Sequence, residues 1–70
     1  SGAYLAAQIA EADDDLGSAI AYYKRALAFD PQDASLQQSV MLALIAQGHF
    51  DESLPYAQML KTVPEAERFS

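Results

Sequence analysis

The stretch that decides the fold is DLGSAIAYYKRALAFDPQD, residues 15–33, because it holds one helical pattern between two boundary signals. Asp15 is a good N-cap residue, and its carboxylate is favoured at the positive end of a helix. From Leu16 onward, apolar and small residues recur at spacings of three, four and seven, as one helix face requires. Pro31 disfavours helix at the preceding residue, so we expect an amphipathic helix that ends near Phe29.

Further helices are expected on both sides of this segment. Upstream, an alanine-rich stretch with Leu5 and Ile9 on one face predicts a helix up to about Ala12. Downstream, Asp33 can cap a helix that ends at Gly48, a residue suited to a left-handed C-terminal position. The expected apolar residues of this downstream helix are Leu36, Val40, Met41, Leu44 and Ile45.

The remaining sequence predicts two more helices. One runs from about Phe50 to Thr62, where Pro55 should remove one backbone hydrogen bond and bend the start of the helix. In this helix, the residues that we expect to point inward are Leu54, Ala57 and Leu60. A fifth helix is expected to begin at Pro64. Helices joined by such short turns predict an antiparallel all-α array.

The helical pattern occurs twice, with a period of about 34 residues. The aligned pairs are Asp14 with Gly48, Leu16 with Phe50, Ala19 with Ser53, Tyr22 with Tyr56, and Ala26 with Leu60. Within residues 15–33, the small residues Ala19 and Ala26 flank the aromatic Tyr23, and Asp-Pro follows. This order and this period resemble the tetratricopeptide repeat family. One departure is Gln37, which stands where that family often has tryptophan.

The resemblance implies an all-α fold of antiparallel helix-turn-helix repeats, forming part of a right-handed α-solenoid. It divides the chain into a first unit at 1–33, a second unit at 34–63, and the start of a following or capping helix at 64–70. The chain begins at Ser1 rather than Met, and two units leave apolar faces uncovered. We therefore expect a fragment of a longer array, bacterial in character, or a chain that self-associates through its exposed ends.

Composition argues against several classes of partner. Ten acidic residues against four basic ones give a formal charge of −6, which disfavours nucleic acid and anionic membrane surfaces. The run VMLALIA at 40–46 is far shorter than the roughly 20 residues that cross a bilayer, so we expect no membrane insertion. The absence of cysteine excludes disulfides and thiolate metal sites. The compartment stays open between cytoplasm and periplasm.

One polar stretch, QGHFDESLPYA at residues 47–57, invites a chemical interpretation. It places His49, the only histidine, beside Asp51 and Ser53. These three side chains straddle a turn and a helix start, so they should not converge as a hydrolase triad must. The stretch also lacks a third strong metal donor, and the acidic run at 11–15 lacks the calcium-loop pattern. We therefore expect a turn or cap role for His49 and predict no catalytic residue, metal or cofactor.

The resemblance implies that function lies on the inner, concave face of the first helix of each unit, where this family binds extended peptides. The matched candidate peptide-binding residues are Tyr4, Gln8, Glu11, Gln38, Leu42 and Ile45. These positions lack the lysine, asparagine and arginine that grip C-terminal carboxylates in one subclass, which disfavours acidic tails. We expect a non-catalytic scaffold for a neutral or apolar peptide or a docking helix. Self-association as a homo-oligomer stays open, as does packing of Leu42 and Ile45 against missing sequence or a second copy.

Overall fold

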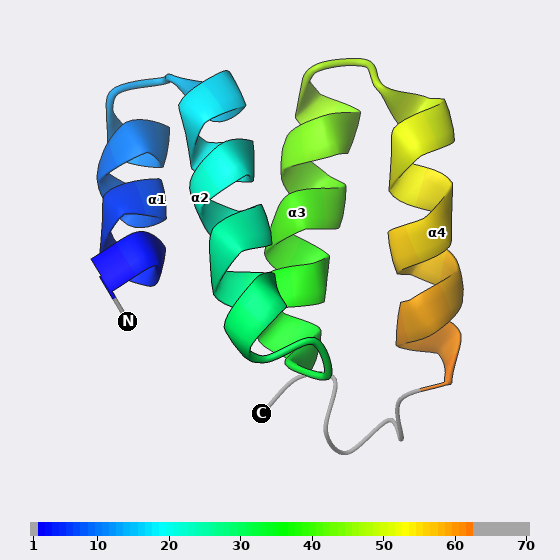
Figure 1. The fold of residues 1–70 in the computed structure, drawn as a ribbon. Coiled ribbons are helices and arrows are strands. Elements are labelled where there is room, and N and C mark those ends of the chain that lie inside the picture. The colour runs from blue at the N-terminus through cyan, green and yellow to red at the C-terminus, as the bar shows by residue number, and fades with distance from the viewer. Residues whose placement is uncertain (1, 63–70) are drawn as a thin grey trace.

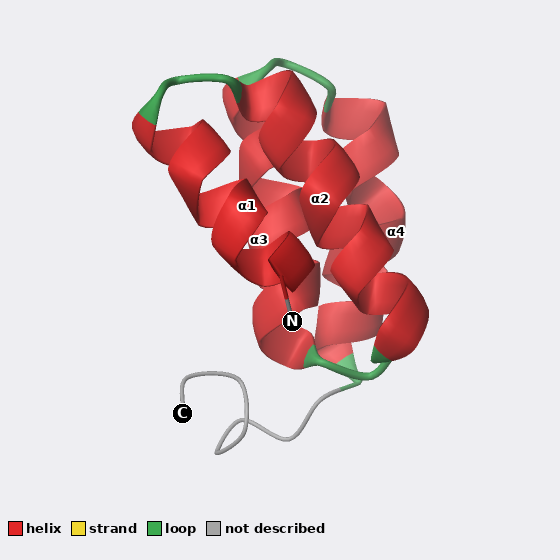
Figure 2. Ribbon diagram, turned by 60° about the vertical axis from the view of Figure 1, so that its left-hand side comes forward, coloured by secondary structure: helices red, strands yellow, loops and turns green. Residues whose placement is uncertain are grey.

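Four α-helices follow one another in the computed structural model, which describes residues 2–62 (Figure 1). They are α1 (Gly2–Ala12), α2 (Leu16–Phe29), α3 (Ala34–Ala46) and α4 (Phe50–Lys61). Consecutive helices are antiparallel, and α1 packs on α2, α2 on α3 and α3 on α4. In the turned view, α1 and α3 lie toward one side and α2 and α4 toward the other (Figure 2). The prediction of an all-α antiparallel array is confirmed, and the helix expected from Pro64 lies outside the described residues.

The turn between α1 and α2 and the turn between α3 and α4 have the same backbone hydrogen bonds. The Asp15 N–H donates to the Ala10 carbonyl at 2.8 Å. At the equivalent place in the second turn, the His49 N–H donates to the Leu44 carbonyl, also at 2.8 Å. The two helical hairpins therefore reverse direction by the same local geometry, although their turn sequences differ.

Both turns contain one residue with a left-handed backbone. Gly48 has a φ of 80°, and its counterpart in the first turn, Asp14, has a φ of 59°. Glycine reaches this region without steric cost, and aspartate is among the few other residues that tolerate it. The expectation that Gly48 ends α3 in this conformation is confirmed.

Aspartate carboxylates begin α2 and α3, as expected. The Asp15 side chain accepts a hydrogen bond from the Ser18 N–H at 3.3 Å. Asp33 Oδ1 accepts from the N–H groups of Ser35 and Leu36 at 2.9 and 3.2 Å. Each carboxylate satisfies amide groups that have no partner inside their helix.

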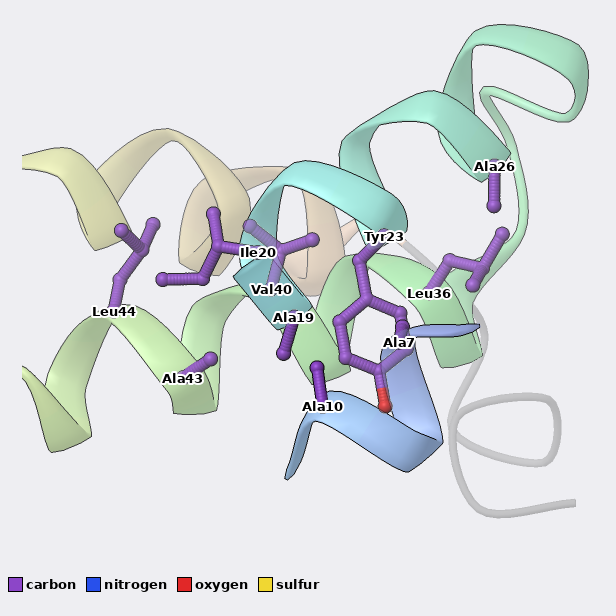
Figure 3. Packing of buried hydrophobic residues seen from close by; sticks show 10 residues of the cluster. All are labelled: Ala7, Ala10, Ala19, Ile20, Tyr23, Ala26, Leu36, Val40, Ala43 and Leu44. Carbon is purple, nitrogen blue, oxygen red and sulfur yellow. The ribbon is translucent and has the colours of Figure 1, made fainter. Parts of the chain in front are cut away.

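The core lies where α2 is enclosed between α1 and α3, and much of it consists of small side chains (Figure 3). Its ten buried apolar residues are Ala7, Ala10, Ala19, Ile20, Tyr23, Ala26, Leu36, Val40, Ala43 and Leu44. Alanines let the backbones of α1 and α2 approach closely, and the Tyr23 ring fills space that they leave. The expected burial of Leu36, Val40 and Leu44 in α3 is confirmed.

The outer helices bury less than the sequence pattern predicts. The pattern places Leu54 inward, but this residue is 56% exposed, so the prediction is wrong. Leu5 and Ile9 do share a face of α1, yet both are exposed. Ala57 and Leu60 are half-buried. The physical reason is that helical periodicity identifies an apolar face, whereas burial also needs a neighbouring helix, and α1 and α4 each pack extensively on one described helix, whereas α2 and α3 each pack on two.

Two more details of α3 and α4 differ from expectation. Ile45, placed on the apolar side of α3, is 40% exposed, while Met41 is half-buried. The helix α4 runs through Pro55, as expected, but it ends at Lys61, one residue before the expected end. A proline near the start of a helix removes only one internal hydrogen bond, which the remaining turns tolerate.

A buried glutamine fastens the turn between α2 and α3. Gln37 is 4% exposed, and its Nε2 donates a hydrogen bond to the Pro31 carbonyl at 2.9 Å. Its Oε1 has no hydrogen-bond partner among the described residues. The bond connects the first turn of α3 to the loop before it.

Candidate functional site

A hollowed surface lies between α1 and α3, with α2 beneath it. Two adjoining hollows of about 420 and 400 Å³ make up this surface, and Tyr4 lines both. The first is lined by Tyr4, Gln8, Glu11, Tyr23, Ser39 and Leu42 among others. The second continues past Tyr4 toward the α2–α3 turn, where Phe29, Asp30, Asp33 and Ser35 line it. We call the two hollows together the α1/α3 groove.

The floor of the groove is organised around the Tyr23 side chain. Its hydroxyl donates a hydrogen bond to Glu11 Oε1 at 2.6 Å. Its ring meets Tyr4 edge to face, with the ring centroids 6.2 Å apart and the planes inclined by 63°. Edge-to-face pairs at this distance are favourable because the positive ring edge meets the negative ring face. Tyr23 therefore positions two groove residues of α1 from its place on α2.

The surroundings of Tyr23 raise the pKa of its hydroxyl to about 12. Burial is the main cause, because it disfavours the charged phenolate. The hydrogen bond to Glu11 and the charge of that carboxylate act in the same direction. The hydroxyl consequently keeps its proton and remains a hydrogen-bond donor over the whole physiological range.

Replacing Tyr23 with phenylalanine should lower the free energy of unfolding by about 1–2 kcal/mol at pH 7, because the bond to the Glu11 carboxylate is lost. The folded-state pKa lies above the usual 10.0, so the neutral hydroxyl stabilises the fold fully below pH 10. That contribution is lost as the pH rises from about 10 to about 12. Urea unfolding at pH 7, 10 and 12, followed by circular dichroism, measures the difference between the two proteins.

The neighbouring substitution Tyr22→Phe is the matched control, because it removes a hydroxyl from the same helix at a half-buried position. The difference between wild type and Tyr23→Phe should shrink between pH 10 and 12. At pH 7 the control should lose less stability than Tyr23→Phe. A constant difference across this range would mean that the Tyr23 hydroxyl does not carry the effect.

The groove contains four of the six residues that the sequence placed at a peptide-binding face. Tyr4, Gln8, Glu11 and Leu42 line the first hollow together. The other two, Gln38 and Ile45, line neither hollow; Gln38 is half-buried and Ile45 is exposed. Both residues belong to α3, but neither borders the α1/α3 groove.

Sequence reasoning missed several residues of the groove, and two of them, Tyr23 and Ser39, carry hydroxyl groups. The pattern assigns Tyr23 to the core alone, although its hydroxyl reaches the groove and bonds to Glu11. Ser39 is absent from the predicted set, although it lines the same hollow. Its position three residues before Leu42 could have indicated it, since residues spaced by three share one helix face.

The polar stretch around His49 forms no convergent site. His49 Nδ1 lies 3.2 Å from Glu52 Oε2, and both side chains are more than half exposed. The Ser53 hydroxyl donates to the Phe50 carbonyl at 2.6 Å, within its own helix. His49 occupies the N-cap position of α4, but its side chain makes no capping hydrogen bond. The turn position of His49 is thus as expected, whereas a capping role of its imidazole is not observed.

Metal sites and membrane-spanning helices can be assessed for residues 2–62, which the structure describes. Within this part of the chain, no group of three or more histidine or acidic side chains is placed to hold a metal ion. Over the same residues, every helix is too short or too polar to cross a membrane.

Comparison of the chain with family models, with curated proteins and with solved structures found no match.

Proposed function

We propose that this chain is a non-catalytic protein-interaction scaffold of the tetratricopeptide type that binds an extended peptide in the α1/α3 groove. The observation that carries the proposal is the groove itself, in which Tyr4, Gln8, Glu11 and Leu42 face one continuous surface. It combines an aromatic ring, hydrogen-bonding groups and an aliphatic side chain. Such a mixture suits a peptide, whose backbone needs polar partners and whose side chains need apolar contacts.

The tetratricopeptide assignment is supported by the equal spacing of equivalent positions in the two hairpins. The left-handed residues Asp14 and Gly48 are as far apart in sequence as Leu16 and Phe50, the first residues of α2 and α4. Ser53 is buried like its counterpart Ala19, as a small residue at a helix contact should be. Equivalent geometry at equal spacing is what two successive repeat units would produce.

The charge of the groove narrows the class of peptide. Among the described residues that line it, three are acidic, namely Glu11, Asp30 and Asp33, and none is lysine or arginine. The chain as a whole carries a formal charge of −6. Glu11 and the Tyr4 ring border the same hollow, which suits a cationic side chain that can use both a carboxylate and an aromatic face. The proposed ligand is therefore a peptide with neutral or basic side chains.

A phage-displayed library of twelve-residue peptides, selected on the immobilised chain, tests this function. Selected peptides should be enriched in lysine or arginine and should bind the chain in fluorescence-anisotropy titrations. Leu42→Ala and Tyr4→Ala should each weaken binding about tenfold, because each removes a contact worth roughly 1.4 kcal/mol.

The matched control is Leu54→Ala, which truncates an equally exposed leucine on α4 outside the groove. This variant should bind the selected peptides as wild type does. Peptides that bind the Leu42→Ala and Tyr4→Ala variants with unchanged affinity would place the binding surface elsewhere and contradict the proposal.

Self-association is the second candidate function, and exposed apolar side chains at both ends of the helical row favour it. Ile9 on α1 and Leu54 on α4 are exposed, and neither lines the groove. Self-association through these ends and peptide binding in the groove would therefore use different surfaces of one chain.

A further inference from the structure

Among the helices that the structure describes, the first and the last each present an apolar outer face. On α1 this face carries Leu5 and Ile9, which are 62% and 64% exposed. On α4 it carries Phe50 and Leu54, which are 62% and 56% exposed. Figure 1 shows α1 and α4 at opposite ends of the row. We call these two surfaces the α1 face and the α4 face.

The α4 face corresponds to a surface that the interior of the same molecule buries. When the two hairpins are aligned, Leu54 corresponds to Ile20 of α2 and Phe50 to Leu16. Ile20 is only 7% exposed and Leu16 is half-buried, because α2 has a helix on both sides whereas α4 has one neighbour among the described helices. The α4 face thus carries large apolar side chains at the same positions as α2, where a following helix buries them.

Part of the α1 face corresponds to a buried part of α3, whereas Leu5 corresponds to Ser39, which is half-buried and borders the groove. In the same alignment, Ile9 corresponds to Ala43, which is 5% exposed, and Ala6 corresponds to Val40, which is fully buried. In each pair one side chain is large and the other is alanine, and the larger one lies on α1 in the first pair and on α3 in the second. The summed side-chain volume at these positions is therefore similar in α1 and α3. Such volume-conserving exchanges are the best tolerated in packed interfaces.

We propose that two copies of this chain associate head to tail, with the α4 face of one copy packed on the α1 face of the next. The argument is that the contact would extend the existing packing of α2 on α3 across two molecules. The four exposed side chains, Leu5, Ile9, Phe50 and Leu54, are uncharged. Acidic residues border both faces, with Asp13 near Ile9 and Asp51 beside Phe50, so the apolar contact must outweigh repulsion at its edges. A second copy is the occupant because one chain carries both complementary faces.

This contact has a distinctive symmetry. It joins two different surfaces, so each copy in a pair still has one free face and association continues into short linear chains. The contact area is that of a single pair of short helices, which predicts weak association that grows with concentration. The proposal rests on the second candidate function, self-association, and since none of the four face residues lines the α1/α3 groove, it stands or falls separately from peptide binding.

Sedimentation velocity and light scattering over a dilution series test the proposal. The weight-average mass of the wild type should rise steadily with concentration. Ile9→Glu destroys the α1 face and Leu54→Glu destroys the α4 face, so each variant alone should associate at least about tenfold more weakly. An equimolar mixture of the two should form dimers and stop there, because each variant retains the face that the other lacks.

Ile45→Glu is the matched control, since it introduces the same negative charge at an exposed aliphatic residue that lies outside both faces and outside the groove. Association of this variant should equal that of the wild type. Circular dichroism melts verify that all variants are folded, and dimer formation in the mixture proves it independently. A wild type that stays monomeric, a mixture that stays monomeric, or undiminished association of Leu54→Glu would each overturn the head-to-tail contact.

Discussion

Replacing Leu44 with alanine is expected to unfold a large fraction of the molecules at 25 °C. The Leu44 side chain is 3% exposed and belongs to the core cluster in α3 (Figure 3). Truncation of a buried leucine costs roughly 2–5 kcal/mol, through lost burial and the cavity that remains. A domain of this size has only roughly 3–5 kcal/mol of net stability. The free energy of unfolding, measured by urea titration and circular dichroism, should therefore fall by most of its value.

The matched control for this prediction is Leu42→Ala. Leu42 lies two residues away on the same helix, but its side chain is 53% exposed and borders the groove. The same chemical change should alter stability by less than about 0.5 kcal/mol. Similar losses at both positions would contradict the assignment of Leu44 to the core and Leu42 to the surface.

The distinction between these two leucines was predictable from the sequence. Both belong to the continuous apolar run at 40–46, yet the helical period places Val40 and Leu44 on one side and Leu42 on another. The residues at the turns were equally informative. Aspartate favours the N-cap of a helix, as at Asp15 and Asp33, and glycine favours a left-handed backbone, as at Gly48. The bounds of α1, α2 and α3 followed from these signals.

The outer faces show what periodicity cannot predict. Ile20 and Leu54 occupy equivalent positions in α2 and α4, and both are large aliphatic residues at the same helical spacing. One is buried and the other is exposed. The difference depends on whether a further helix lies alongside, which is a property of the assembly and not of the local sequence.

The candidate site divides in a similar way. Tyr4, Gln8 and Glu11 could be placed on one face because residues spaced by three and four lie together on a helix. The bond from Tyr23 to Glu11 joins residues on two helices, and its existence depends on how α1 packs on α2. A sequence pattern assigns a buried tyrosine to the core, but it does not show where the hydroxyl emerges.

Ala19 is a position where enlarging the side chain should strongly destabilise the fold. It is fully buried at the contact of α1 with α2, and Figure 3 shows Ala10 of α1 facing it. In Ala19→Leu the added isopropyl group has no space, so the helices must separate. Overpacking of this kind costs about 1–3 kcal/mol, and more where the contact is close, as between two small residues. Urea unfolding should show the loss directly.

Separation of α1 from α2 should also reach the groove, because the Tyr23 hydroxyl on α2 bonds to Glu11 on α1. In Ala19→Leu that bond lengthens and the Tyr23 ring becomes more hydrated, so its pKa should fall from about 12 toward the usual 10.0. Ultraviolet absorbance titration of the tyrosines measures this shift in pKa. The part of the absorbance change that is missing in Tyr23→Phe belongs to Tyr23. The control Ala21→Leu makes the same change at an exposed position of α2 and should leave both stability and titration unchanged. If Ala19→Leu and Ala21→Leu had the same stability and the same tyrosine titration, there would be free space beside Ala19. The close packing of α1 on α2 would then not be what positions Tyr23 in the groove.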